Sequence, residues 1–117
     1  MKSAVAFVVL LLAFPLNAQA DTLVGLEQEA RNLLTQGQSL NRATGAGGAC
    51  GQKMRTLQPQ VKQLQSRIDA LPRTSPDHTY LSLAANYLQL CVSCSERLGP
   101  EQCSEAATYL SKMSSRR

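Results

Sequence analysis

The chain is poor in aromatic residues, histidine and acidic residues. Among its 117 residues there is no Trp and only one His, and eight Asp plus Glu stand against twelve Lys plus Arg. Phe occurs only at Phe7 and Phe14, so the segment after residue 20 has three Tyr as its only aromatic residues. Its core must therefore be aliphatic. Platforms on which single-stranded nucleic acids stack need aromatic side chains among basic ones, so we expect no nucleic-acid partner.

Catalytic patterns are equally scarce. The sequence has no G-x-S-x-G motif and no paired carboxylates in an obvious cleft, and the single histidine has no nucleophile to activate. We interpret His78 as a solvent-facing residue in the first turn of a helix. The glycines between positions 45 and 51 fit neither G-x-x-x-x-G-K-[ST] nor G-x-G-x-x-G, the two phosphate-binding patterns. The sequence therefore predicts neither an enzyme nor a bound cofactor or metal.

Long apolar runs are limited to the beginning of the chain. Lys2 precedes an apolar run over 4–14, then come Pro15 and the triplet Ala18-Gln19-Ala20. This is the pattern of a secretory signal peptide over 1–20, with a mature chain that begins at Asp21. The run is roughly eleven residues, against about 20 needed to span a bilayer, and no second run follows. We expect an exported protein, periplasmic or secreted, with no membrane span and no lipidated cysteine at the cleavage site.

The segment 21–117 has the size of a single small domain. A domain of about 100 residues buries a modest core and gains from covalent cross-links outside the cytosol. Four cysteines in this segment supply two disulfides, which persist in oxidising compartments. The cysteine count and the signal peptide support each other.

Apolar residues recur at helical spacing in four segments, over about 22–35, 54–71, 76–97 and from 99 onward. Asp21 or Thr22 is expected to cap the first helix and Ser75 the third. A glycine-rich flexible loop is expected over 41–51, and the C-terminal tail is expected to fray. Pro59 predicts a kink in the second helix or a restart near Thr56.

Two helices have faces with a clear role. The second carries an apolar seam with steps of three and four residues, made by Met54, Leu57, Val61, Leu64, Ile68 and Leu71. The third is apolar nearly all round and is expected to be the central helix, with one solvated stripe made by Ser82, Asn86, Gln89, Ser93 and Glu96. The fold class that follows is all-α, a small antiparallel bundle of about four helices stapled by two disulfides.

The cysteines allow three interpretations. Cys91 and Cys94 have the C-x-x-C spacing of thiol oxidoreductases, but they fall at the end of a predicted helix, where the dipole disfavours a thiolate. A zinc site of four cysteines matches no common module. We expect structural disulfides. Because Cys94 and Cys103 lie at similar distances from the turn at 98–99, the expected pairs are Cys50 with Cys91 and Cys94 with Cys103.

A basic surface is the main functional signal. Between 42 and 73, six basic residues face a single acid, Asp69. This pattern is either a solvated helix face or a surface for an anionic partner. The side chains that we assign to a possible interaction surface are Lys53, Arg55, Lys62, Arg67 and Arg73.

We therefore expect a protein that binds another protein or an anionic component of the cell envelope, of the inhibitor, immunity or accessory-factor type. An uncovered apolar seam on the second helix would offer a groove or a homodimer face. The alternative function is a thiol-based metal-binding or redox protein, which predicts free thiols. A third is an envelope structural or stress protein without a specific ligand.

Overall fold

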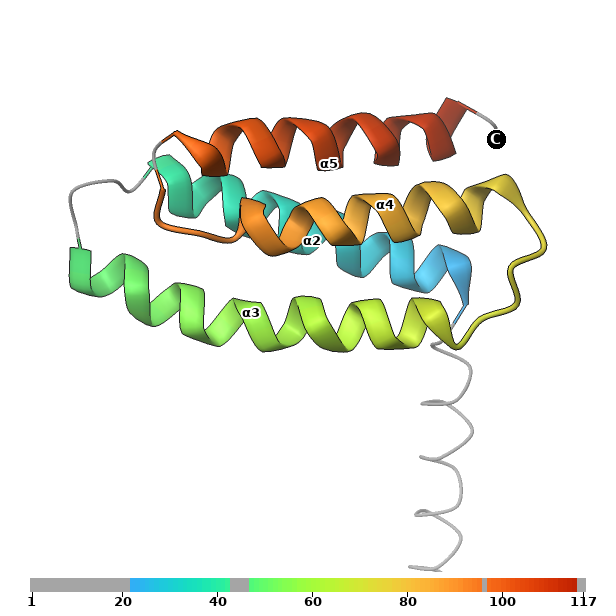
Figure 1. Cartoon of the computed structure of the whole chain (residues 1–117), viewed down its shortest axis with the longest axis horizontal. Coiled ribbons are helices and arrows are strands. Elements are labelled where there is room, and N and C mark those ends of the chain that lie inside the picture. The colour runs from blue at the N-terminus through green and yellow to red at the C-terminus, as the bar shows by residue number, and fades with distance from the viewer. Residues whose placement is uncertain (1–21, 43–46, 96, 116–117) are drawn as a thin grey trace, which may run out of the picture.

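The protein folds into an all-α antiparallel bundle, as the sequence predicts. The computed structural model describes residues 22–42, 47–95 and 97–115. These residues form four helices and no strand: α2 (Leu23–Arg42), α3 (Gly47–Asp69), α4 (Pro76–Cys91) and α5 (Leu98–Ser115). Each helix runs opposite to the one before it, in up-down-up-down order (Figure 1). The expected signal peptide over 1–20 and the end of the tail lie outside the described residues.

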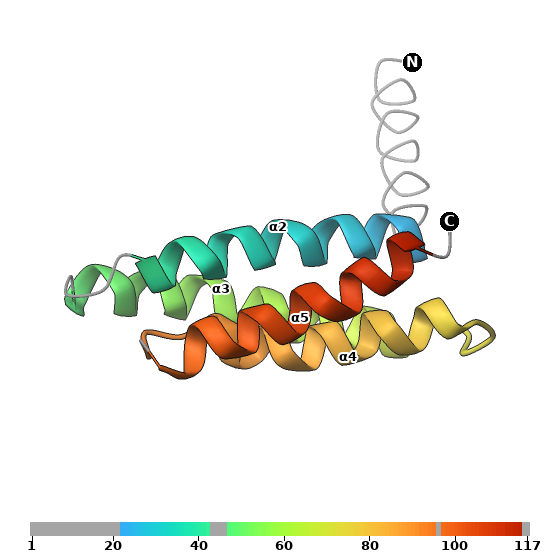
Figure 2. The same ribbon diagram turned by 90° about the horizontal axis from the view of Figure 1, so that it is seen from above.

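The four helices are not equivalent in their neighbours. α2 and α4 each contact all three other helices, whereas α3 and α5 lie on opposite sides and do not contact one another in the described part of the chain. Figures 1 and 2 show α4 between α3 and α5, with α2 behind. The central place predicted for the third helix is confirmed, although α2 shares it. None of the described helices is long and apolar enough to cross a membrane.

α2 begins as predicted but is longer. Thr22 Oγ1 accepts a hydrogen bond of 3.0 Å from the backbone N–H of Gly25, as expected of an N-cap. The helix continues through Gly37 to Arg42 rather than ending near residue 35. Gly37 is therefore not a stop signal. It lies where α2 approaches the end of α4, with the side chains of Cys91 and Val92 close by.

The flexible loop predicted over 41–51 is helical at both of its ends. Residues 41–42 belong to α2 and 47–51 to α3, while 43–46 lie outside the described residues. α3 then runs through Pro59 as one helix, so the predicted restart near Thr56 is wrong. Proline has no N–H, so the carbonyl four residues before it loses its usual helical donor. Pro59 and Arg55, which carries that carbonyl, are both exposed residues of α3.

α4 starts where predicted and ends earlier. Ser75 is the N-cap, its hydroxyl accepting from the His78 N–H at 3.4 Å, and Pro76 follows in the first turn. The helix ends at Cys91 instead of near 97, and α5 begins at Leu98. The chain between them is a non-helical connection, which decides how the cysteines pair.

The core is aliphatic, as the composition requires. The seam of α3 lies inside it, with Leu57, Val61, Leu64 and Ile68 buried and Met54 and Leu71 partly buried at its ends. The seam therefore offers no face for a second copy. The other large side chains that are fully buried are Leu26, Leu81, Val92, Leu88, Leu110 and Met113.

The polar stripe of α4 is only partly solvated. Gln65 of α3 donates to Asn86 Oδ1 at 2.9 Å and to the Ala85 carbonyl at 3.3 Å, and accepts from Gln89 Nε2 at 2.8 Å. Gln58, two turns earlier on α3, donates to the Val92 carbonyl at 3.2 Å. Asn86 and Gln89 of the stripe thus hydrogen-bond to Gln65 of α3, although Asn86 remains exposed, so the prediction of a fully solvated stripe is only partly right.

Candidate functional site

The four cysteines form two disulfides, and the expected pairing is wrong. Cys50 is bonded to Cys94 and Cys91 to Cys103, with Cα atoms 6.0 Å and 4.5 Å apart. Cys91, the last residue of α4, is buried and joins the second turn of α5. Cys94 is exposed in the connection between α4 and α5 and reaches back to the first turn of α3.

The early end of α4 explains the error. The prediction placed Cys91 and Cys94 on the same helix, so that Cys94 was level with Cys103 across a tight turn. Because the helix stops at Cys91, Cys94 does not continue along α4 and is bonded to Cys50 of α3, while Cys91 is bonded to Cys103 of α5. The Cys50–Cys94 bond joins the connection before α5 to α3. The Cys91–Cys103 bond joins the end of α4 to α5.

The disulfides leave no thiol for chemistry. None of the four cysteines is free, and the residues that the structure describes contain no group of three or more His, Cys, Asp or Glu placed to hold a metal ion. Thiolates are what both redox catalysis and zinc binding by cysteine require. In this state the cysteines act as cross-links.

His78 is buried rather than solvent-facing, which corrects the prediction. It is 4% exposed, and its Nε2 lies 2.8 Å from the Ile68 carbonyl near the end of α3. A carbonyl only accepts, so Nε2 carries the proton and donates. Ile68 O also accepts from the Leu71 N–H at 3.0 Å. His78 thus joins the start of α4 to the end of α3, and it is a structural residue.

The predicted basic residues separate into two groups. Arg67 forms an ion pair of 2.8 Å with Glu29 of α2, so it holds two helices together. The other four are exposed: Lys53, Arg55, Lys62 and Arg73. Arg55 and Lys62 lie seven residues apart on the same outer side of α3, and we call these two residues the basic face. Lys53 lies roughly 160–180° around the helix from them.

The basic face lies in a part of the chain without acidic side chains. No Asp or Glu occurs between residues 30 and 68. The two acids just before this stretch are already paired, because Glu27 binds Arg31 at 2.7 Å and Glu29 binds Arg67. The positive charge of the basic face is therefore not neutralised within its own stretch of sequence.

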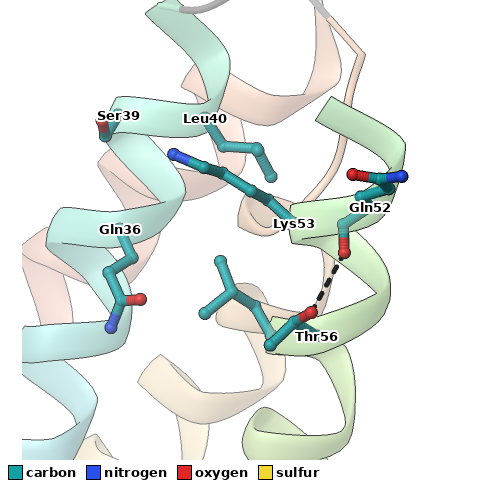
Figure 3. Close-up of a pocket in the computed structure, with 7 residues that line it drawn as sticks. Gln36, Ser39, Leu40, Gln52, Lys53 and Thr56 are labelled. Carbon is teal, nitrogen blue, oxygen red and sulfur yellow. Dashed lines mark hydrogen bonds between the residues drawn. The ribbon is translucent and has the colours of Figure 1, made fainter. Parts of the chain in front are cut away.

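A groove lies between the last turns of α2 and the first turns of α3 (Figure 3). Its volume is about 360 Å³, at the lower end of the range of about 300–1,000 Å³ typical of ligand sites. Leu40 and Leu57, both nearly buried, belong to its lining. The remaining lining is polar: Gln36, Ser39, Gln52, Lys53 and Thr56.

Among the residues that the structure describes, Lys53 is the one that brings a charge to this lining. Figure 3 shows its side chain reaching from α3 across the groove toward α2, while Gln36 and Ser39 stand on the opposite wall. Thr56 is occupied, since its hydroxyl donates to the Gln52 carbonyl at 3.1 Å. An ammonium group, an amide and a hydroxyl above an apolar floor suit a ligand with a carboxylate and a short apolar part.

A second surface, missed from the sequence, gathers all three tyrosines. Tyr109 of α5 stacks on Tyr87 and Tyr80 of α4, with ring centroids 5.7 and 6.5 Å apart. The ammonium of Lys112 lies 5.3 and 5.7 Å from the centroids of Tyr109 and Tyr80. The seven-residue spacing of Tyr80 and Tyr87 places both on one side of the helix and was the available signal.

The structure thus places Lys53 in a groove and leaves Arg55, Lys62 and Arg73 exposed. Arg67 instead forms an ion pair with Glu29. It gives the cysteines and His78 structural roles. The chain matches no protein-family model, and neither the curated proteins nor the solved structures include one with significant similarity to it.

Proposed function

We propose that this is an exported protein without catalytic activity that binds another protein through the groove of Lys53. Its class is that of an inhibitor, immunity or accessory factor. The partner presents an acidic segment whose carboxylate meets Lys53. The disulfides support an oxidising location, periplasmic or extracellular.

The single observation that carries the proposal is the Lys53 ammonium in a groove whose described lining residues include no acid. A cation without a counter-charge attracts an anionic group at little cost, and a charge-assisted hydrogen bond adds about 1.5–3 kcal/mol. The apolar floor made by Leu40 and Leu57 adds contact for an aliphatic side chain. A protein segment combines both features, which supports a protein partner over a simple anion.

Site-specific photo-crosslinking in the native host tests this. A photoreactive residue at Gln36, on the α2 wall of the groove, should give a stoichiometric adduct with one acidic protein. The same residue at Thr108, exposed on α5, should not give it. An adduct of equal yield at both positions, or none at either, contradicts the proposal and leaves the structural protein without a ligand as the better account.

Charge variants sharpen the test. Lys53→Gln should lower adduct yield about tenfold, the loss expected for one charge-assisted hydrogen bond of at least about 1.4 kcal/mol. Ser104→Glu on α5 changes the net charge by the same single unit at an exposed position and should leave the yield unchanged. An adduct that contains lipopolysaccharide or lipid instead of protein would identify an anionic envelope component and overturn the protein partner.

A further inference from the structure

The surface of α4 and α5 that carries the tyrosines also carries the exposed aliphatic residues next to them. Three large hydrophobic residues in the described part of the chain are strongly exposed, and two of them, Leu90 at 47% and Leu98 at 39%, flank the connection between α4 and α5. We call the tyrosine face the set Tyr80, Leu83, Tyr87, Leu90, Leu98 and Tyr109.

Helical geometry makes this face continuous on α4. Tyr80, Leu83, Tyr87 and Leu90 follow steps of three, four and three, a second apolar seam on the same helix. Leu83 and Leu90 are each two residues after a buried core leucine, so they lie roughly 160° around the helix from the core side. Leu83 and Leu90 are therefore directed away from the bundle, whereas Tyr80 and Tyr87 pack partly against its core.

The face is also held rigid. The Cys91–Cys103 disulfide joins α4 to α5, and the Cα atoms of the two cysteines are 4.5 Å apart. The stacked rings of Tyr87 and Tyr109 are nearly parallel, with an interplanar angle of 10°. A preorganised aromatic surface loses little conformational entropy on binding, and tyrosine is enriched among residues that dominate interface energies.

The charges beside this face are arranged to match a second copy. On α5, Glu101 and Glu105 occupy the N-terminal half and Lys112 the C-terminal half, and all three are exposed. Glu105 and Lys112 are about 10.5 Å apart along the axis, from a rise of 1.5 Å per residue. A two-fold axis through the centre of the face reverses this order in the other copy, so that Lys112 lies opposite Glu105 of the partner subunit.

We propose that the chain forms a symmetric homodimer through the tyrosine face, with α4 and α5 antiparallel to their copies. The proposal is independent of the groove, because α5 and α3 lie on opposite sides of the bundle. α4 is about 24 Å long, and two adjacent helices present a width of about 20 Å, so the projected area is on the order of 500 Å² per copy. Stable interfaces bury about 800 Å² per partner, so the dimer should dissociate at micromolar concentration.

Sedimentation of the oxidised mature chain from micromolar to millimolar concentration tests the dimer. The mass should rise from one chain to two. Leu90→Glu should keep the protein monomeric, because it places a charge in the interface at a position exposed in the single chain. Val24→Glu is the matched control, since Val24 is 57% exposed on α2 and away from this face. A wild type that stays monomeric at millimolar concentration overturns the proposal, as does an equal effect of the two variants.

A charge exchange distinguishes a second copy from any other partner. Lys112→Glu alone and Glu105→Lys alone should each weaken the dimer at least tenfold, because like charges then face each other. The double variant restores opposite charges across the two-fold axis and should recover most of the affinity. Only self-association predicts this recovery, so a double variant weaker than both single variants contradicts the two-fold arrangement. None of these substitutions lies in the groove, so the crosslinking experiment at Gln36 tests the proposed function separately from the dimer.

Discussion

Replacement of Gly37 by alanine tests how closely α2 approaches the disulfide of the core. A Cβ atom at Gly37 would lie 2.7 Å from Cys91 Sγ, 3.4 Å from the Cys91 carbonyl oxygen and 3.4 Å from Val92 Cγ2. Cys91 Sγ is bonded to Cys103 on α5, so it cannot rotate away by itself. In Gly37→Ala, α2 must therefore move away from the end of α4.

Two opposing terms set the size of the effect. Alanine is favoured over glycine in a helix interior by about 1 kcal/mol. Overpacking a filled core costs about 1–3 kcal/mol, and the tethered sulfur places Gly37 at the upper end. We expect a net loss of about 2 kcal/mol, which for a domain of this size lowers the melting temperature by roughly 10 °C.

Gly51 provides the matched control. It lies in the interior of α3, and the nearest atom to its Cβ position is Arg55 Nη1 at 3.8 Å, an ordinary contact. Gly51→Ala should therefore raise the free energy of unfolding by about 0.5–1 kcal/mol. Urea unfolding of both variants with intact disulfides, followed by circular dichroism, measures the difference. If Gly37→Ala is as stable as the wild type or more so, the close packing of α2 on Cys91 is refuted.

A double-mutant cycle assigns the loss to the sulfur. In a Cys91→Ala/Cys103→Ala background the clashing Sγ atom is absent, so Gly37→Ala should cost less than about 1 kcal/mol. An unchanged cost in that background would show that Val92 or the backbone, rather than the disulfide, restricts this position.

Two further predictions concern the contacts that join the helices. His78→Ala removes the donor to the Ile68 carbonyl and leaves a gap at a buried position, so it should lower the free energy of unfolding by about 2 kcal/mol. The control Thr79→Ala, at an exposed position, should change it by less than about 0.5 kcal/mol. Equal effects of the two variants in urea unfolding would contradict the buried role of His78. Reduction of both disulfides, which close loops of 44 and 12 residues, removes constraints of about 4 and 3 kcal/mol at most in the chain-entropy model, so the melting temperature in excess reductant should fall by at least about 10 °C. An unchanged melt would show that the disulfides do not stabilise the bundle.

The helices and most of the core follow from the periodicity of the sequence, since the seam of α3 and the caps of α2 and α4 are where the pattern puts them. The boundaries do not follow, because local signals compete with tertiary contacts. Gly37 reads as a helix stop, yet it lies inside α2, where a glycine fits because Cys91 Sγ leaves no room for a side chain. Pro59 reads as a break, yet α3 continues because its seam is buried on both sides of it.

The pairing of the cysteines and the role of His78 depend on three-dimensional facts that spacing does not contain. One turn of helix at the end of α4 decides whether Cys91 or Cys94 faces α5. His78 is polar and close to a helix start, so its burial depends on the path of the α3–α4 connection. The candidate groove needed both α2 and α3 in place, although Lys53 was already identified from charge alone.

Disulfide mapping of the protein, purified from the compartment in which it accumulates and alkylated before digestion, tests the account most directly. Trypsin cleaves after Lys53, Arg73, Arg97 and Lys112 but leaves Cys91 and Cys94 on one peptide, so a second cleavage after Val92 is needed. The structure predicts no alkylated cysteine, with the Cys50 peptide linked to 93–97 and the 74–92 peptide linked to 98–112. A Cys50 peptide linked to 74–92 would contradict the fold at the end of α4. Alkylated Cys91, Cys94 or Cys103 would contradict the structural role of the disulfides and favour a thiol-based metal or redox protein.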